Sequence, residues 1–220
     1  MHKTMAVTCI DLSIDMQAFT FKGNPPFTLT KAINRIEGSN PEYVYDYIGC
    51  TQTGTHVQGA HYFNRLGKKI DQYPLERFYG LAYMIDWSYS AGTLSLADCK
   101  EKMAGYGGQK ILVIRSGFMS HRMKHLISDA DRCGLSMEAA AYLVELGIQM
   151  IGIDAPGVEP RSNKNYEVNV FLGEKDILLL ECLSNLELIP SSAFTLSAFP
   201  LKITGVEGTP CRAVALINDL

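Results

Sequence analysis

The sequence has neither a surplus of one charge nor a long apolar run, and each absence excludes a class of protein. Its 20 Lys and Arg residues against 23 Asp and Glu residues give a formal net charge of −3. Nucleic acids and anionic membranes are bound through an excess of basic side chains, so we expect neither as a partner. No stretch reaches the ~20 apolar residues of a membrane-spanning helix. The N-terminal residues also lack the apolar segment of a signal peptide, which predicts a cytoplasmic protein.

The cysteines form no metal-binding or disulfide pattern. The chain has six of them, far apart and without a CxxC pair: Cys9, Cys50, Cys99, Cys133, Cys182 and Cys211. In a chain of 220 residues this spacing is typical of reduced, mostly buried thiols. A P-loop, a GxGxxG fingerprint and a GxSxG nucleophile elbow are also missing, so the common phosphate, dinucleotide and serine-hydrolase motifs are not found.

The hydrophobic content and its pattern predict a folded domain of mixed α/β class. Hydrophobic residues make up 47% of the chain, and no repeat or linker divides it, so we expect one domain over residues 1–220. More strands than helices are expected, at Ala6–Leu12, Phe27–Ile36, Tyr43–Cys50, Gly80–Trp87, Lys110–Arg115, Ile148–Ile153, Asp176–Glu181, Phe194–Ile203 and Cys211–Ile217. Helices are predicted at Ser95–Met103 and Ser136–Leu146, each with a serine N-cap, and Asn165–Leu172 is a short helix or a loop.

A polar segment between two predicted strands is the most informative part of the chain. Thr51–Phe63 is dense in Thr, Gly, His and Gln and poor in apolar side chains. A segment of this composition is typical of a functional loop, because core positions need apolar residues. We therefore expect site residues between Thr51 and Phe63.

The polar segment and six others, in order along the chain, resemble the cyclase superfamily, which includes bacterial kynurenine formamidases and isatin hydrolases. The polar segment, with its Gly54-Thr55-His56 core, is similar to that superfamily's HxGTHxDxPxH motif. The other similar segments are Asp11–Ser13 with Gly23–Phe27, Ile114–Gly117, Gly152–Pro160, Glu181–Leu186 and Pro210–Ala215. The resemblance implies a swivelling β/β/α domain and a homodimer or higher homo-oligomer.

The resemblance also implies two metal ions and an acid/base histidine, but most of the corresponding positions differ in this chain. The family's metal ligands fall on Gln52, His56, Gln58, Asn169 and Glu181, and its acid/base histidine falls on Tyr62. Of these six positions only His56 and Glu181 keep the family's residue type. Divalent cations prefer imidazole nitrogens and anionic oxygens, which neutral carboxamides replace poorly. We therefore expect no bound metal and no other cofactor.

The remaining residues predict acid/base chemistry in a cavity with polar walls. A carboxylate beside an imidazole fixes its tautomer and raises its basicity, so His56 and Glu181 are the expected base and its orienting partner. Tyr62 could donate a proton or a hydrogen bond to an oxyanion, and His61 is a weaker candidate that a local register change would bring in. Gln52, Gln58 and Asn169 would bind a polar small-molecule substrate, and Phe27 could add an aromatic wall.

Each of these residues also has a plain structural interpretation. His56 could be a satisfied core histidine, Tyr62 and Phe27 could be core aromatics, and Asn169 is supported by its alignment alone. Glu181 follows a very apolar strand, where an unpaired carboxylate would be costly to bury, and this favours a site.

Three functions follow from this pattern. The first is a metal-independent enzyme that closes, opens or rearranges a ring on a carbonyl-containing metabolite, as in specialised-metabolite biosynthesis. The second is a metal-assisted hydrolase of an amide, lactam or lactone. The third is a non-catalytic scaffold that pairs with an active relative.

Overall fold

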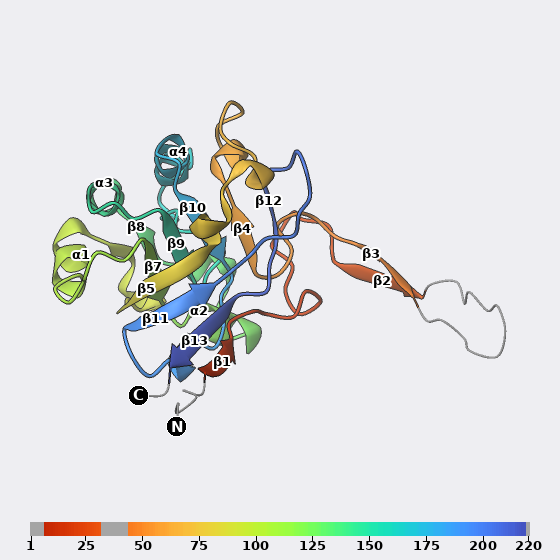
Figure 1. The fold of residues 1–220 in the computed structure, drawn as a ribbon, viewed down its shortest axis with the longest axis horizontal. Helices are drawn as coiled ribbons and strands as arrows, with labels where there is room; N and C mark the ends of the chain where they lie inside the picture. Colours follow the sequence, from red (N-terminus) through yellow and green to blue (C-terminus); the bar gives the residue numbers. More distant parts are fainter. Residues whose placement is uncertain (1–6, 32–43, 219–220) are drawn as a thin grey trace, which may run out of the picture.

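The computed structural model describes residues 7–31 and 44–218, which fold around a nine-stranded mixed sheet (Figure 1). The strand order is β1-β13-β11-β5-β7-β9-β10-β4-β12. The bounds are β1 Val7–Asp11, β4 His56–Gln58, β5 Tyr79–Asp86, β7 Ile111–Arg115, β9 Met150–Ile153, β10 Leu178–Glu181, β11 Ala193–Ser197, β12 Gly208–Pro210 and β13 Val214–Asn218. Strands β5, β7, β9 and β10 are parallel, and the other neighbours in this sheet pair antiparallel.

The parallel strands form the centre because apolar side chains cover both of their faces. In β7, Leu112 and Ile114 belong to the core under the helices, whereas Ile111 and Val113 belong to the core on the opposite face. An unbroken apolar run suits a strand that is buried on both sides. The second core is enclosed by the curl of the sheet and includes residues from β4 through β13, such as Val57 and Ala215.

The α-helices lie on one side of the sheet (Figure 1). They are α1 Leu96–Lys102, α2 Phe118–Met123, α3 Met137–Glu145 and α4 Glu167–Glu174. Six 3-10 helices connect other segments: η1 Ala60–Tyr62, η2 Ile70–Gln72, η3 Leu75–Phe78, η4 Tyr89–Ala91, η5 Asp129–Asp131 and η6 Leu186–Leu188. Within the described ranges, none of the helices is long and apolar enough to cross a membrane.

The helix boundaries predicted from capping residues are confirmed. The Ser95 hydroxyl accepts a hydrogen bond from the Asp98 backbone N–H, and the Ser136 hydroxyl accepts one from Ala139. Gly147 follows α3 with a φ of 77°, a left-handed conformation that glycine adopts without strain. A two-stranded parallel sheet, β6 Thr93–Leu94 with β8 Gly134–Leu135, joins the segments that enter α1 and α3.

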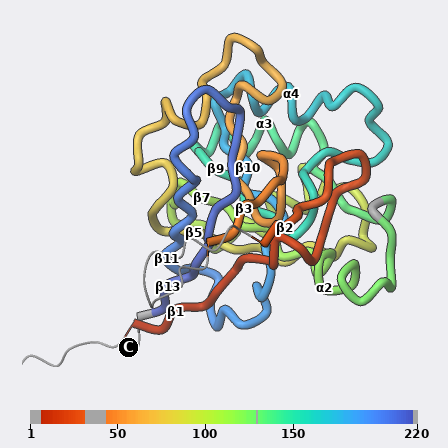
Figure 2. Tube along the Cα trace, turned by 90° about the vertical axis from the view of Figure 1, so that its right-hand side faces the viewer, coloured from red at the N-terminus to blue at the C-terminus, as the bar shows by residue number. Residues whose placement is uncertain are grey.

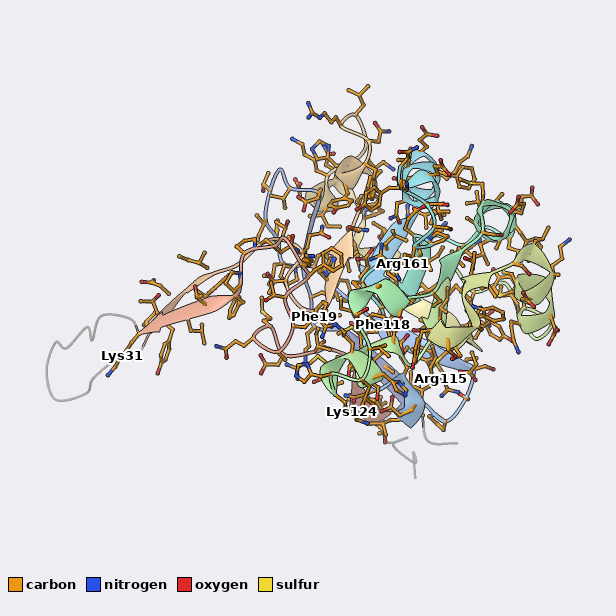
Figure 3. The ribbon with its side chains drawn as sticks, turned by 180° about the vertical axis from the view of Figure 1, so that it is seen from behind. Phe19, Lys31, Arg115, Phe118, Lys124 and Arg161 are labelled. Atoms are coloured by element: carbon orange, nitrogen blue, oxygen red, sulfur yellow. The ribbon has the colours of Figure 1, made fainter. Side chains whose placement is uncertain are left out.

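A two-stranded arm projects away from the body of the molecule. It consists of β2 Thr28–Lys31 paired antiparallel with β3 Tyr45–Ile48, and every residue of both strands is exposed (Figure 1). Seen from behind, Lys31 lies far out on this arm while Phe19 lies within the body (Figure 3). The two predicted strands therefore pair as a hairpin over the described residues, whereas their outer ends at residues 32–36 and 43 and the turn expected at residues 38–41 lie outside the described residues.

Two short strands correct the expectation of loops. The composition of Thr51–Phe63 predicts an irregular segment, yet His56–Gln58 forms β4 between β10 and β12. Strand β12 itself, Gly208–Pro210, lies between the predicted strands Phe194–Ile203 and Cys211–Ile217, in a segment for which no strand is expected. Strands β11 and β13 pair antiparallel, and together with β1 they make one edge of the sheet (Figure 2).

Candidate active site

Strand register brings the most important predicted pair together. His56 on β4 lies directly opposite Glu181 on the antiparallel strand β10. Directly opposed residues of an antiparallel pair point to the same face of the sheet, and so do residues two apart on one strand. His56, Gln58 and Glu181 therefore share a face, and all three line one cavity of about 270 Å³.

The buried imidazole of His56 faces the carboxylate of Glu181. The distance from Nε2 of His56 to Oε2 of Glu181 is 3.5 Å, and both side chains are almost fully buried. Nδ1 of His56 lies 2.9 Å from the carbonyl oxygen of Gly54, which requires the proton on Nδ1. Nε2 is therefore the nitrogen that exchanges a proton, and it is the one that lies in the cavity beside the carboxylate.

The second oxygen of Glu181 accepts a hydrogen bond from Gln58. Nε2 of Gln58 donates to Oε1 of Glu181 over 2.7 Å, which leaves Oε1 of Gln58 turned away from the carboxylate. Oε1 of Gln58, Nε2 of His56 and Oδ1 of Asn169 are buried and have no hydrogen-bond partner among the described residues. Buried polar atoms are rarely left unpaired, so these three are expected to bind a ligand or ordered water.

Asn169 lines the same cavity from helix α4. Its backbone N–H donates to Oε2 of Glu159 over 2.8 Å, and the Val168 N–H and the Asn163 amide donate to Oε1. The buried Glu159 carboxylate thus satisfies the first-turn N–H groups of α4, which lack intrahelical partners. This contact fixes the turn that carries Asn169.

Thr55 holds together the segments on which His56 and Glu181 lie. Its hydroxyl donates to the carbonyl of Cys182 over 2.6 Å and accepts the backbone N–H of Ile14 over 2.9 Å. Cys182 has a φ of 58°, so the chain turns sharply directly after Glu181. A non-glycine residue in this conformation is strained and persists only when its surroundings fix it. Thr55 therefore supports the geometry of the pair.

Tyr62 and Gln52 lie at the edge of the cavity. Tyr62 is 44% exposed and packs edge-on against Phe63, at 4.4 Å between ring centroids. Desolvation, followed by the nearby charge of Glu181, raises the pKa of Tyr62, so its phenol stays a hydrogen-bond donor. Nε2 of Gln52 donates to Glu207 over 3.2 Å, which attaches it to the segment before β12.

Two of the predicted site residues lie elsewhere. Phe27 stacks on Tyr47 at the base of the arm, with 5.7 Å between ring centroids, and it is not part of the cavity wall. His61 also lies outside the cavity wall. It is the neighbour of Tyr62 in η1, and consecutive residues of a helix point in different directions, so only Tyr62 lines the cavity. The structure thus brings together His56, Glu181, Tyr62, Gln52, Gln58 and Asn169, and leaves out Phe27 and His61.

The cavity contains groups that sequence reasoning missed. Phe19, Phe21 and Arg132 line it together with Glu159 and Tyr166. The Phe-Thr-Phe alternation directly before the Gly-Pro loop could have indicated Phe19 and Phe21, since alternate residues face one side. Arg132 has no such signal, because it lies in a short polar segment without motif or periodicity.

The ionisable groups at this position are too few for the usual metal site. His56 and Glu181 are one imidazole and one carboxylate, and no cluster of three or more His, Cys, Asp or Glu suited to a metal occurs in residues 7–31 and 44–218. A protein zinc site generally takes at least three such ligands. The amide N–H of Gln58 also occupies one oxygen of Glu181 that a cation would use.

Comparison with known proteins gives consistent matches over almost the whole chain. The Cyclase family model matches residues 10–160. The kynurenine formamidase of Bacillus mycoides (strain KBAB4) is 30% identical over 209 residues, covering 93% of this chain and 95% of that protein. The kynurenine formamidase of Salinibacter ruber (strain DSM 13855 / M31) is 27% identical over 210 residues, with 96% and 97% covered.

Solved structures agree with the fold. Isatin hydrolase A from Ralstonia solanacearum superposes with a TM-score of 0.84 at 19% identity, covering 96% of this chain and 92% of that one. Isatin hydrolase A from Labrenzia aggregata, bound to benzyl benzoate, gives 0.82 at 20% identity, with 97% and 94% covered. The mixed α/β fold predicted from the sequence is confirmed, and the enzymes among these relatives indicate an enzyme of the hydrolase type.

Proposed function

Because the chain belongs to the Cyclase family, we propose that it is a small-molecule enzyme that closes, opens or rearranges a ring on a carbonyl-containing metabolite without a metal ion. The observation that carries this proposal is the buried pair of His56 and Glu181, 3.5 Å apart in a cavity with amide walls. A carboxylate-paired imidazole is a general base suited to neutral pH.

In this mechanism His56 moves the proton and Glu181 stabilises the charge that results. Nε2 of His56 takes a proton from the N–H, O–H or acidic C–H of the substrate, and the carboxylate of Glu181 faces the imidazolium that forms. The substrate's nucleophile attacks its own carbonyl carbon, and the carbonyl electron pair moves onto oxygen. The Tyr62 hydroxyl donates a hydrogen bond to this developing oxyanion, and the imidazolium then returns the proton.

The donor set favours the metal-free mechanism. One imidazole, one carboxylate and the amides of Gln52, Gln58 and Asn169 fit a divalent cation poorly, because amides carry no charge to offset the loss of its water. One of the positions on which a family metal ligand falls is Gln58, whose amide instead donates a hydrogen bond to Glu181. No step of the proposed reaction needs the metal.

A second candidate is hydrolysis of an amide, lactam or lactone. The identity of 30% to a kynurenine formamidase over almost the whole chain favours it. In this alternative a single weakly held cation at His56 and Glu181 would polarise the substrate carbonyl or the attacking water.

Metal content and thermal stability separate the two candidates. The protein is purified without chelator, its zinc, manganese and iron are measured by plasma mass spectrometry, and its melting temperature is recorded with and without zinc or manganese. We expect far less than one metal ion per chain and no rise in melting temperature. Stoichiometric metal, or a rise of several degrees, would overturn the metal-free proposal and return the chain to the hydrolases.

Activity is then tested on a panel of aryl amides, lactams, lactones and their open forms, with isatin among them. We expect turnover that His56→Gln and Glu181→Gln abolish. His121→Gln is the matched control, since Nδ1 of His121 also lies near a backbone carbonyl, that of Gly117 at 2.8 Å, and His121 is not part of this cavity. Turnover in none of the four proteins would point to the non-catalytic scaffold, and equal turnover in all four would exclude His56 and Glu181 from the mechanism.

The arm is the surface that best fits a second copy of the chain. Leu29, Tyr45, Tyr47 and Ile48 are each about half exposed or more, which is unusual for apolar side chains so close together. We propose that the arm packs against a partner subunit in a homodimer or higher homo-oligomer. Sedimentation velocity tests this: Tyr47→Ser with Ile48→Ser should shift the wild-type oligomer to the monomer, and a monomeric wild type would overturn it.

The cysteines suit the proposed cytoplasmic location. All six are free thiols, and Cys99 and Cys133 are buried, where burial raises the pKa of each to about 11. Buried, protonated thiols are inert and need no oxidising compartment. Biosynthesis of a specialised metabolite is the process that we propose for the altered site.

A further inference from the structure

The cavity holds one cationic side chain that the proposed reaction does not use. Arg132 lines the cavity and is half-buried, and its Nε donates a long hydrogen bond of 3.4 Å to the backbone carbonyl of Glu159. Its guanidinium lies over the ring of Phe21, with Cζ 6.0 Å from the centroid. No ion pair joins Arg132 to a carboxylate in the part of the chain that the structure describes.

The two carboxylates of the cavity are engaged by other groups. Glu159 accepts the Asn163 amide and the first-turn N–H groups of α4, while Glu181 accepts Gln58 and faces His56. The guanidinium of Arg132 therefore keeps donors for an anion from outside. Its planar fork matches a carboxylate better than it matches any neutral group.

The unpaired atoms deeper in the cavity specify the rest of the ligand. Oε1 of Gln58 and Oδ1 of Asn169 are acceptors, so a ligand that satisfies them must bring N–H or O–H donors. The orientation of Gln58 is fixed chemically, since its amide oxygen would repel the carboxylate that its nitrogen now contacts.

The walls of the cavity select a flat and small molecule. Phe19 and Phe21 lie on the segment before the arm, and Phe63 and Tyr166, with ring centroids 5.4 Å apart, lie on another part of the wall. A volume of about 270 Å³ is at the low end for ligand pockets, which suits a compound of one or two rings.

We infer that the site binds a small aromatic carboxylate with a neighbouring N–H or O–H donor, and that Arg132 is the residue that binds its carboxylate. The inference rests on the proposed function, because it takes this cavity as the substrate site. It adds the substrate's charge class and assigns specificity to a residue outside the acid/base pair.

Binding of three simple probes by calorimetry tests the inference without any turnover. The probes are 2-aminobenzoate, its neutral analogue 2-aminobenzamide, and benzoate, which lacks the amino donor. We expect wild-type protein to bind 2-aminobenzoate about tenfold or more tightly than 2-aminobenzamide, as a charge-assisted bidentate contact implies. Arg132→Gln should remove that preference.

Two further variants keep the result interpretable. Arg161→Gln is the matched control, because Arg161 is exposed, donates to the Ala130 carbonyl from the same region and does not line the cavity (Figure 3). It should keep the wild-type preference. Asn169→Leu should lower the affinity for 2-aminobenzoate to near the affinity for benzoate. The preference for the carboxylate over the carboxamide should remain.

The inference is wrong if Arg132→Gln keeps the carboxylate preference, or if wild type prefers the amide or binds none of the probes at millimolar concentration. Failure here is distinct from failure of the proposed function. His56→Gln should abolish turnover and still bind 2-aminobenzoate, so loss of turnover with no role for Arg132 would refute only the inference. Intact turnover in His56→Gln with an Arg132-dependent preference would refute only the proposed reaction.

Discussion

The amide nitrogen of Gln58 donates a hydrogen bond of 2.7 Å to Oε1 of Glu181, within the same cavity in which His56 faces Oε2. Both oxygens of this buried carboxylate thus have a protein group beside them. A cation would have to compete with the Gln58 N–H for Oε1. The contact shows how a buried carboxylate and imidazole can remain side by side when a neutral amide stands at a neighbouring position, because the amide supplies the carboxylate with a hydrogen-bond donor.

Gln58→Asp should make the protein unstable unless a metal is added. The substitution places a second carboxylate beside Glu181 and removes its hydrogen bond, and an unpaired buried group costs about 1–3 kcal/mol or more. We expect a lower melting temperature that manganese or zinc restores in part, because the introduced carboxylate would join His56 and Glu181 as a third ligand.

The control for this prediction is Gln58→Leu, which also removes the hydrogen bond but adds no charge. Its melting temperature should fall without any response to metal. A metal response in Gln58→Leu or in wild type, or none in Gln58→Asp, would contradict the interpretation of Gln58 as the residue that excludes the cation.

His56→Gln should abolish most of the activity and leave the fold intact. General acid/base groups contribute about 10²–10⁴-fold to rates, so we expect a fall of that order in kcat. Glutamine is of similar size, and its amide can still donate to the Gly54 carbonyl that Nδ1 now contacts. Turnover of the best substrate from the panel and the circular dichroism spectrum check both parts, and a change in KM alone would contradict the role of a base.

Much of this site is predictable from local sequence, because the motif fixes which residues are close in the chain. The Gly54-Thr55-His56 motif indicates the base, and the apolar strand that ends at Glu181 indicates a buried carboxylate that belongs to a functional site. The helix ends are equally local, as a serine before each of the two predicted helices and a glycine after α3 determine them. These features depend on neighbours within a few residues.

The rest depends on contacts that sequence periodicity does not encode. Strand β4 has only three residues, two of them polar, so it is too short to show an alternating hydrophobic pattern in the sequence. It is a strand only because it pairs with β10 and β12. Phe27 is not among the residues that line the cavity, and its ring stacks on Tyr47 of the arm. Arg132 reaches the cavity through a segment with no pattern, so three-dimensional packing alone reveals it.

Tyr62→Phe should lower kcat without changing how kcat varies with pH in the alkaline range. Loss of one hydrogen-bond donor to an oxyanion costs about 10²–10³-fold in kcat, and we expect the lower part of that range because Tyr62 is 44% exposed. Desolvation and then the charge of Glu181 raise the pKa of Tyr62 above its ordinary value of 10.0, so the phenol is neutral throughout the accessible range.

The measurement is the pH profile of kcat for both proteins. The two profiles should be parallel up to about pH 10, where the ordinary phenol titrates. A descending limb near pH ~9 that Tyr62→Phe removes would show that the phenol ionises earlier than its surroundings predict. Equal kcat values would exclude Tyr62 from the mechanism.

Asp176→Asn should destabilise the protein near neutral pH and much less in acid. Asp176 accepts hydrogen bonds from Lys68 at 2.8 Å and from the Tyr73 hydroxyl at 2.7 Å, and that hydroxyl in turn accepts the backbone N–H of Ala60. Burial alone would raise the pKa of Asp176, but the hydrogen bonds from Lys68 and Tyr73 outweigh it and hold the pKa below the ordinary 3.8.

The direction in which the stability contribution of Asp176 changes with pH follows from this lowered pKa. Above the ordinary value the carboxylate is ionised in the folded and unfolded chains, and the full stabilisation is present. As pH falls through the ordinary value and then the folded-state pKa, the unfolded chain and then the folded chain bind the proton, and the stabilisation is lost. Urea unfolding should therefore give a deficit of about 1 kcal/mol for Asp176→Asn at about pH 7, modest because the group is partly exposed, and a smaller one at about pH 3, below the ordinary value.

Asn is the right replacement because Asp176 has a φ of 60°, a conformation that asparagine tolerates better than most residues. Asp71→Asn serves as control, since Asp71 accepts the Gly205 N–H and no lysine or arginine pairs with it within the described residues. Its unfolding free energy should differ little from wild type at either pH. A deficit for Asp176→Asn that stays constant between the two pH values would mean that the lost contact is steric and not one of charge.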